Sequence, residues 1–200
     1  MNLDQVTQTW DLEQVFNSLD EHGFALIDDA YPLEFLAQVR QECILNLGEF
    51  REAAIQNGVV SRIRSDHILW IDEQLPIASQ HTQALLALGY AFNQNFYSNI
   101  REIEAHFASY QAGEFYALHR DNPQQKNNRI LSCVFYMHTE WHSSWGGQLR
   151  LQDKHDNWHV IEPAPNRLAI FQSDLLHEVL PAQQQRLSIT AWLRSQQQLW

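Results

Sequence analysis

Cysteine and long apolar runs are scarce in this chain of 200 residues. Its two cysteines, Cys43 and Cys133, have no partner at the spacing of a metal-binding motif, so we expect reduced, buried thiols consistent with a cytosolic protein. No run approaches the roughly 18 apolar residues that cross a bilayer. The polar start also lacks the charged and apolar zones of a secretory signal. We therefore predict a cytoplasmic protein without a membrane partner.

Basic residues are the next shortage, because 13 Lys and Arg stand against 24 Asp and Glu and give a formal net charge of −11. Residues 1–100 contain no lysine at all. An acidic surface repels a phosphate backbone, so nucleic acid is a poor candidate partner. A local basic cleft would still permit nucleic-acid demethylation, and the simplest explanation of the acidic residues is that they keep the protein soluble.

The hydrophobic content of 44%, with 12% aromatic residues, suffices for one packed core. We therefore assign residues 1–200 to a single domain, with helical support and a lid in 1–100 and a β-core in 101–194. Apolar spacing in the first half predicts a short strand at 24–28 and helices over 12–19, 33–47 and 77–96. The second half predicts short strands at 103–110, 130–137, 147–151, 157–162, 167–172 and 186–194, which is typical of a barrel or jelly roll.

His119, Asp121 and the distant His177 form the motif with the clearest chemistry. In an extended strand, residues i and i+2 face the same side, so His119 and Asp121 can offer an imidazole and a carboxylate to one metal ion. A strand-borne His177 would complete a set of two histidines and one carboxylate, which leaves positions open on Fe(II) for a chelating co-substrate and O2. Zinc sites are usually closed by four ligands, so the set favours iron, with zinc and manganese as alternatives.

A longer motif surrounds these ligands. The segment 110–123, YQAGEFYALHRDNP, resembles the first metal-binding segment of the 2-oxoglutarate- and Fe(II)-dependent prolyl hydroxylases, in particular the oxygen-sensing branch that acts on prolines in other proteins. The resemblance covers about residues 57–194 and implies a mainly β (α+β) fold with a double-stranded β-helix core, jelly-roll or cupin-like, flanked by N-terminal helices. Further segments match in order: RILSCVFY at 129–136, WGGQLR at 145–150, IEP at 161–163, RLAIF at 167–171, HEVLP at 177–181, RLSITAW at 186–192 and, more loosely, RIRSDHILWID at 62–72.

The resemblance also implies roles for particular residues. His119, Asp121 and His177 would bind Fe(II), with 2-oxoglutarate and O2 as co-substrates and ascorbate as a candidate reductant. Arg186, nine residues beyond His177, would grip the far carboxylate of 2-oxoglutarate with two parallel hydrogen bonds. The other members of the co-substrate pocket would be Tyr136, Tyr110, Thr190 and Trp192. Thr190 and Trp192 alternate with Arg186 and Ser188, so all four should face one side of a strand.

By the same resemblance, residues 57–72 correspond to a loop and strand that fold over the substrate in proteins of this family. Arg62 and Arg64 are candidate peptide contacts, with plain surface charges as the alternative, and Trp70 belongs to the same lid. We predict an ion pair between Asp66 and Arg129 that ties this lid to the barrel.

These parts predict a dioxygenase that hydroxylates a prolyl residue in a protein or peptide and releases succinate and CO2. Hydroxylation of free proline or another small metabolite is the alternative within the same chemistry. A cupin-like binding protein without activity is the alternative from another class, but such a protein has no need of both an open iron site and an acid anchor.

Overall fold

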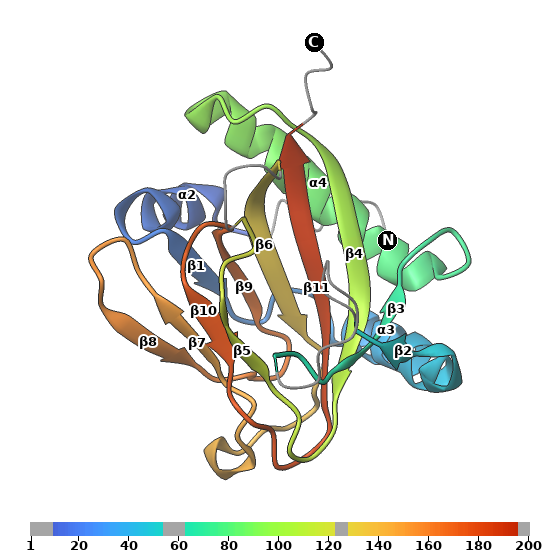
Figure 1. Cartoon of the computed structure of the whole chain (residues 1–200). Coiled ribbons are helices and arrows are strands. Elements are labelled where there is room, and N and C mark those ends of the chain that lie inside the picture. Colours follow the sequence, from blue (N-terminus) through green and yellow to red (C-terminus); the bar gives the residue numbers. More distant parts are fainter. Residues whose placement is uncertain (1–9, 54–62, 123–127, 196–200) are drawn as a thin grey trace.

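The protein is built in three layers, with helices on one face of a large sheet and a smaller sheet on the other (Figure 1). The computed structural model describes residues 10–53, 63–122 and 128–195. Its elements are α2 (Leu12–Glu21), β1 (Phe24–Ile27), α3 (Leu33–Leu45), the 3-10 turn η1 (Leu47–Glu49), β2 (Arg51–Glu52), β3 (His67–Trp70), α4 (Pro76–Phe96), β4 (Ile100–Tyr110), β5 (Tyr116–His119), β6 (Arg129–Tyr136), η2 (Ser143–Trp145), β7 (Leu149–Gln152), β8 (Trp158–Ile161), β9 (Leu168–Gln172), β10 (His177–Val179) and β11 (Arg186–Ser195).

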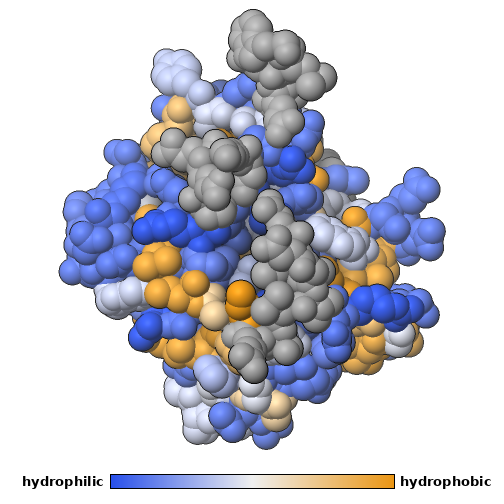
Figure 2. All heavy atoms as spheres, in the orientation of Figure 1, coloured by the Kyte–Doolittle hydropathy of each residue, from blue (hydrophilic) through white to orange (hydrophobic). Residues whose placement is uncertain are grey.

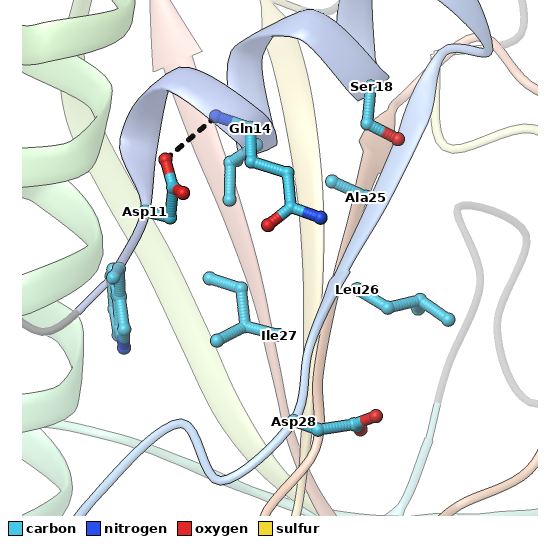
Figure 3. A pocket seen from close by; sticks show the side chains of 9 residues that line it. Asp11, Gln14, Ser18, Ala25, Leu26, Ile27 and Asp28 are labelled. Carbon is cyan, nitrogen blue, oxygen red and sulfur yellow. Dashed lines mark hydrogen bonds between the residues drawn. The ribbon is translucent and has the colours of Figure 1, made fainter.

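Helices α2, α3 and α4 cover one face of the seven-stranded sheet, whose order is β1-β9-β6-β11-β4-β3-β2. Asp11 begins α2 by accepting a hydrogen bond from the backbone N–H of Gln14, as Figure 3 shows beside the pocket between α2 and β1. The carboxylate of Glu42 on α3 accepts from the N–H groups of Ile77 and Ala78, which satisfies the first turn of α4. Glu42 therefore links α3 to the beginning of α4.

Successive side chains along β6 and β11 alternate between two environments. Cys133 and Phe135 on β6, like Ile189 on β11, pack with the helices in the main core. Val134 and Tyr136, on the other face of β6, pack with residues of the smaller sheet. Because successive side chains point to opposite faces, each central strand contributes both to the helical core and to the space between the sheets.

The four-stranded sheet has the order β5-β10-β7-β8 and brings distant segments together. His177 on β10 pairs directly with His119 on β5. Ahead of β5 in the sequence, residues 63–65 lie along its outer edge, with Ala117 N donating to Ile63 O and Ser65 N donating to Phe115 O. The chain then continues into β3, which pairs with β4 of the large sheet. Residues 63–70 therefore form a crossing segment, which runs from one sheet to the other.

The predicted fold class is confirmed, and each predicted helix and strand lies within a few residues of its observed position. The short strands β5 and β10 carry His119 and His177, as the metal-ligand pattern predicted, and β2 and β3 add to them. Both cysteines are buried and unpaired, as predicted. In the part of the chain that the structure describes, no helix is long and apolar enough to span a bilayer. Figure 2 shows apolar side chains gathered over the outer face of the smaller sheet, where Leu118, Trp158 and Val160 are exposed.

Candidate metal centre

The three predicted ligands meet between the two sheets. His119 ends β5, Asp121 follows it, and His177 begins β10. One ligand atom from each of the three lies within 4.8 Å of the other two. Asp121 Oδ1 is 3.5 Å from His119 Nε2, and Asp121 Oδ2 is 3.5 Å from His177 Nε2. The facial arrangement expected from the sequence is therefore present, and it presents two nitrogens and a carboxylate to one point.

Backbone carbonyls fix the orientation of both imidazoles. His119 Nδ1 lies 2.7 Å from Ala117 O, and His177 Nδ1 lies 2.9 Å from Leu175 O. A carbonyl can only accept, so each Nδ1 carries a proton, and in the neutral ring Nε2 keeps its lone pair for a metal ion. This outer hydrogen bond is the usual support of a metal-ligating histidine.

The protonation states also suit a cation. Burial would raise the pKa of Asp121, but the imidazoles of His177 and His119 and the Ser132 hydroxyl, which donates at 2.7 Å, outweigh it and hold the pKa well below its usual range. Burial lowers the pKa of His177 to about 4. At neutral pH the carboxylate is therefore charged and His177 is neutral, which are the forms that bind metals.

Arg186 is the second feature of the cavity, and it is buried without an acidic partner. Only 1% of the residue is exposed, and Nη1 donates to Ser188 Oγ at 3.1 Å. Its guanidinium carbon lies 4.9 Å from the ring centres of both Tyr110 and Tyr136. Across the described residues, no carboxylate forms an ion pair with Arg186, and neither its Nε nor Tyr136 Oη has a hydrogen-bond partner. A buried cation with unused donors beside it fits an acidic ligand.

The cavity joins these two features. Its β11 side consists of Arg186, Thr190 and Trp192, so the predicted alternation on one face of the strand is confirmed. Trp192 Nε1 is another buried donor without a partner among the described residues. The remaining lining residues come from both sheets and the crossing segment: Arg64, Tyr110, Tyr116, His119, Asp121, Val134, Leu149, Phe171, His177 and Val179.

The predicted lid residues lie in different environments. Arg62 falls outside the described residues, Trp70 is 51% exposed, and Arg64 is buried in the cavity wall rather than at the surface. The predicted ion pair between Asp66 and Arg129 is wrong. Asp66 accepts from Nε and Nη2 of Arg64, at 2.6 and 3.0 Å. Arg129 on β6 pairs with Glu104 on β4, across the intervening β11, at 2.5 Å.

The reason for this exchange of partners is local geometry. Arg64 and Asp66 are two residues apart on the crossing segment, so the bidentate pair forms within it. The guanidinium carbon of Arg129 lies instead 3.7 Å from the ring centre of Trp192. Arg129 therefore supports the cavity wall through Trp192.

No role was predicted from the sequence for three residues that contact this site. Tyr116 stacks on His119, with ring centres 3.6 Å apart and planes 15° from parallel. Ser132 holds Asp121 and contacts Ser173 Oγ at 2.9 Å. His106 lies beside Arg64. Ser132 could have been found, since it alternates with Val134 and Tyr136 along one strand. The stack of Tyr116 on His119 depends on ring orientation within β5, and the contact of His106 with Arg64 connects separate elements.

Comparisons with known proteins agree with this geometry. Residues 105–194 match the family model of the 2OG-Fe(II) oxygenase superfamily. A Pseudomonas putida prolyl-4-hydroxylase structure is 32% identical and has a TM-score of 0.85, over 93% of this chain and all of the other. A Trichoplax adhaerens prolyl hydroxylase, in complex with a peptide of the hypoxia-inducible factor oxygen degradation domain, is 29% identical with a TM-score of 0.86, over 96% and 92% of the two chains.

Curated relatives are longer proteins. The hypoxia-inducible factor prolyl hydroxylase of Caenorhabditis elegans is 28% identical over 90% of this chain and 28% of its own length. The Mus musculus protein Egl nine homolog 1 is also 28% identical, over 90% of this chain and 49% of its own length. This chain thus spans less than half the length of either relative. The ligand geometry, the family match and the full-length likeness to the P. putida enzyme agree: the chain belongs to the prolyl hydroxylase family of the 2OG-Fe(II) oxygenase superfamily.

Proposed function

We propose that this protein is an Fe(II)- and 2-oxoglutarate-dependent dioxygenase that hydroxylates a prolyl residue in a protein or peptide. One observation carries the proposal: a buried arginine without an acidic partner among the described residues shares a cavity with a two-histidine, one-carboxylate cluster. That combination suits a co-substrate with an acid at one end and a metal-chelating group at the other. 2-Oxoglutarate is such a molecule.

The residues present fit both groups. His119, Asp121 and His177 would hold Fe(II), and Arg186 with Tyr136 would hold the far carboxylate of 2-oxoglutarate, where Arg186 Nε and Tyr136 Oη lack partners in the described part of the protein. When bound, Fe(II) supplies the redox chemistry in which O2 converts 2-oxoglutarate to succinate and CO2 and one oxygen atom enters the substrate as hydroxyl.

The protein's own task is to bind, orient and exclude water. Arg186, placed between two tyrosine rings, fixes one end of the co-substrate relative to the ligand cluster. Val134, Leu149 and Phe171 line the same cavity and limit the access of water. No side-chain base is needed to remove a carbon-bound hydrogen by this route, so the absence of a nucleophilic triad from the sequence-based assignment is consistent with the proposal.

A protein or peptide substrate is supported by the relatives, one of which is described in complex with a peptide. Hydroxylation of free proline or another small metabolite is the alternative. We further propose that residues 1–200 act as one domain with a catalytic core at 101–194. A cytoplasmic location is supported by the two free, buried cysteines, Cys43 and Cys133.

The test uses a lysate from cells that lack the native enzyme. The lysate is incubated with the protein, Fe(II), 2-oxoglutarate and heavy-isotope O2, and both peptides and small molecules are searched for label. Asp121→Ala serves as the control because it removes one metal ligand. We expect label on prolines in peptides with the wild type alone. Label confined to a small metabolite would replace the substrate assignment, and the lack of 2-oxoglutarate consumption would overturn the chemistry.

A further inference from the structure

Arg64 and Tyr116 contact the candidate metal centre without belonging to its ligand set. Arg64 is 9% exposed, and its guanidinium carbon lies 4.8 Å from the centre of the Tyr116 ring. Tyr116 in turn stacks closely on the imidazole of His119. An arginine, a tyrosine and a metal ligand therefore form a continuous chain of contacts along one wall of the cavity.

The guanidinium of Arg64 is fixed by Asp66 of its own segment and by His106 of the large sheet. Asp66, with no exposed surface, accepts its two parallel hydrogen bonds, and Nη2 lies 3.4 Å from His106 Nε2 on β4. His106 Nδ1 faces the carbonyl of Phe107 at 3.1 Å, so the proton lies on Nδ1 and Nε2 is the acceptor. Two acceptors thus hold the planar fork of Arg64 in one orientation.

The backbone reinforces the same connection. Arg64 forms a bridge with Tyr116, and Ala117 N donates to Ile63 O at 2.7 Å. The carbonyl of Ala117 is the group that accepts the hydrogen bond from His119 Nδ1. The crossing segment therefore supports both groups that determine the plane of the His119 ring, namely the Ala117 carbonyl and the Tyr116 ring.

We propose that Arg64 is a positioning residue for the metal ligand His119: it acts through Tyr116 and ties the ligand-bearing β5 to the large sheet. This inference rests on the proposed function for the identity of the site. Outer contacts of metal-ligating histidines typically account for roughly 10- to 100-fold in metal affinity. Because Arg64 acts through Tyr116, the loss of either contact should have the same consequence.

The experiment measures Co(II) affinity of the whole chain by its visible absorption bands. Arg64→Lys keeps the positive charge but removes the planar fork and its stacking. Arg167→Lys is the matched control, because Arg167 makes the same bidentate contact with Asp28, at 2.6 and 3.0 Å, outside the cavity lining. We expect Arg64→Lys to weaken Co(II) binding about 10-fold and to change its spectrum, whereas Arg167→Lys changes neither.

A second pair of variants keeps the inference testable if Arg64→Lys does not fold. Tyr116→Phe retains the stacked ring and should bind Co(II) as the wild type does, whereas Tyr116→Leu should lose about as much affinity as Arg64→Lys. The double variant Arg64→Lys/Tyr116→Leu should be little worse than either single one. Wild-type affinity in folded Arg64→Lys, or equal affinities of the two Tyr116 variants, would overturn the positioning role. Failure of the wild type itself to bind Co(II), or binding that survives Asp121→Ala, would instead count against the proposed metal site.

Discussion

Two buried arginines line one cavity, and they differ in what surrounds their charge. Arg64 is bound by the carboxylate of Asp66, which is fully buried, and lies close to His106. Arg186 lies between two tyrosine rings and pairs with no carboxylate of the described residues. The charge of Arg64 is thus compensated within the protein, whereas the charge of Arg186 is left for a ligand.

The difference separates a structural cation from a binding cation. Removing one partner of a buried ion pair leaves an uncompensated charge, whereas removing a buried cation that has no partner relieves a desolvation cost. The same substitution should therefore have opposite effects at the two positions.

Arg64→Met should destabilise the metal-free protein by about 3–5 kcal/mol, because Asp66 would be left buried and unpaired. Chemical denaturation with urea measures the free energy of unfolding. In the double variant Arg64→Met/Asp66→Leu, much of that loss should be recovered, since no charge remains. If Arg64→Met unfolds at the wild-type urea concentration, the Arg64–Asp66 pair does not stabilise the fold.

Arg186→Met should leave the stability of the metal-free protein unchanged or raise it by about 1 kcal/mol, because a buried charge without an acidic partner is removed. The same urea titration measures it, with 2-oxoglutarate left out of the buffer. A loss of unfolding free energy comparable to that of Arg64→Met would show that the charge of Arg186 is compensated within the protein. The two arginines would then not differ in this respect.

Gly147→Ala should raise the KM for 2-oxoglutarate about 10-fold, equivalent to about 1.4 kcal/mol. Gly147 has φ +67°, and a Cβ added there would lie 3.0 Å from Cδ of Arg186, so the anchor must shift. Gly113→Ala is the matched control, because its φ of +91° imposes similar strain while nothing lies within 4 Å of the added Cβ. Equal changes of KM in both variants would assign the effect to backbone strain alone.

His138 provides the smallest test, since its Nε2 accepts from the N–H of Leu187 at 3.2 Å, beside Arg186. Burial, followed by the charges of Arg186 and Arg40, lowers the pKa of His138 to about 3. A histidine with a lowered folded pKa contributes stability above about pH 6.5 and loses it as pH falls towards 3, by at most about 1.4 kcal/mol per pH unit.

In Arg186→Met, the pKa of His138 should rise but stay below 6.5, because burial is the larger cause. An NMR titration of the ring measures it. Titration of His138 near pH 6.5 in the wild-type protein would contradict the burial of an uncharged imidazole beside this arginine.

Sequence alone accounted for much of this site. The i, i+2 spacing of His119 and Asp121 and the alternation from Arg186 to Trp192 predict side-chain direction, because a strand has only two faces. The partner of Asp66 was not predictable in the same way, because a sequence shows which residues are charged but not how far apart they lie in the fold. Strand β10 has only three residues, too few to show a period. The stack of Tyr116 on His119 depends on ring orientation, which no periodicity encodes.

The role of Arg186 as a binding cation is tested most directly by the binding of two ligands to two proteins. 2-Oxoglutarate and 2-oxopentanoate, which lacks the far carboxylate, are titrated calorimetrically onto the Fe(II)-loaded wild type and Arg186→Met under anaerobic conditions. The wild type should prefer 2-oxoglutarate by at least about 100-fold, as expected for a bidentate, charge-assisted contact, and Arg186→Met should bind both ligands almost equally. A preference for 2-oxoglutarate that persists in Arg186→Met would show that another group holds the far carboxylate and would contradict the distinction between the two arginines.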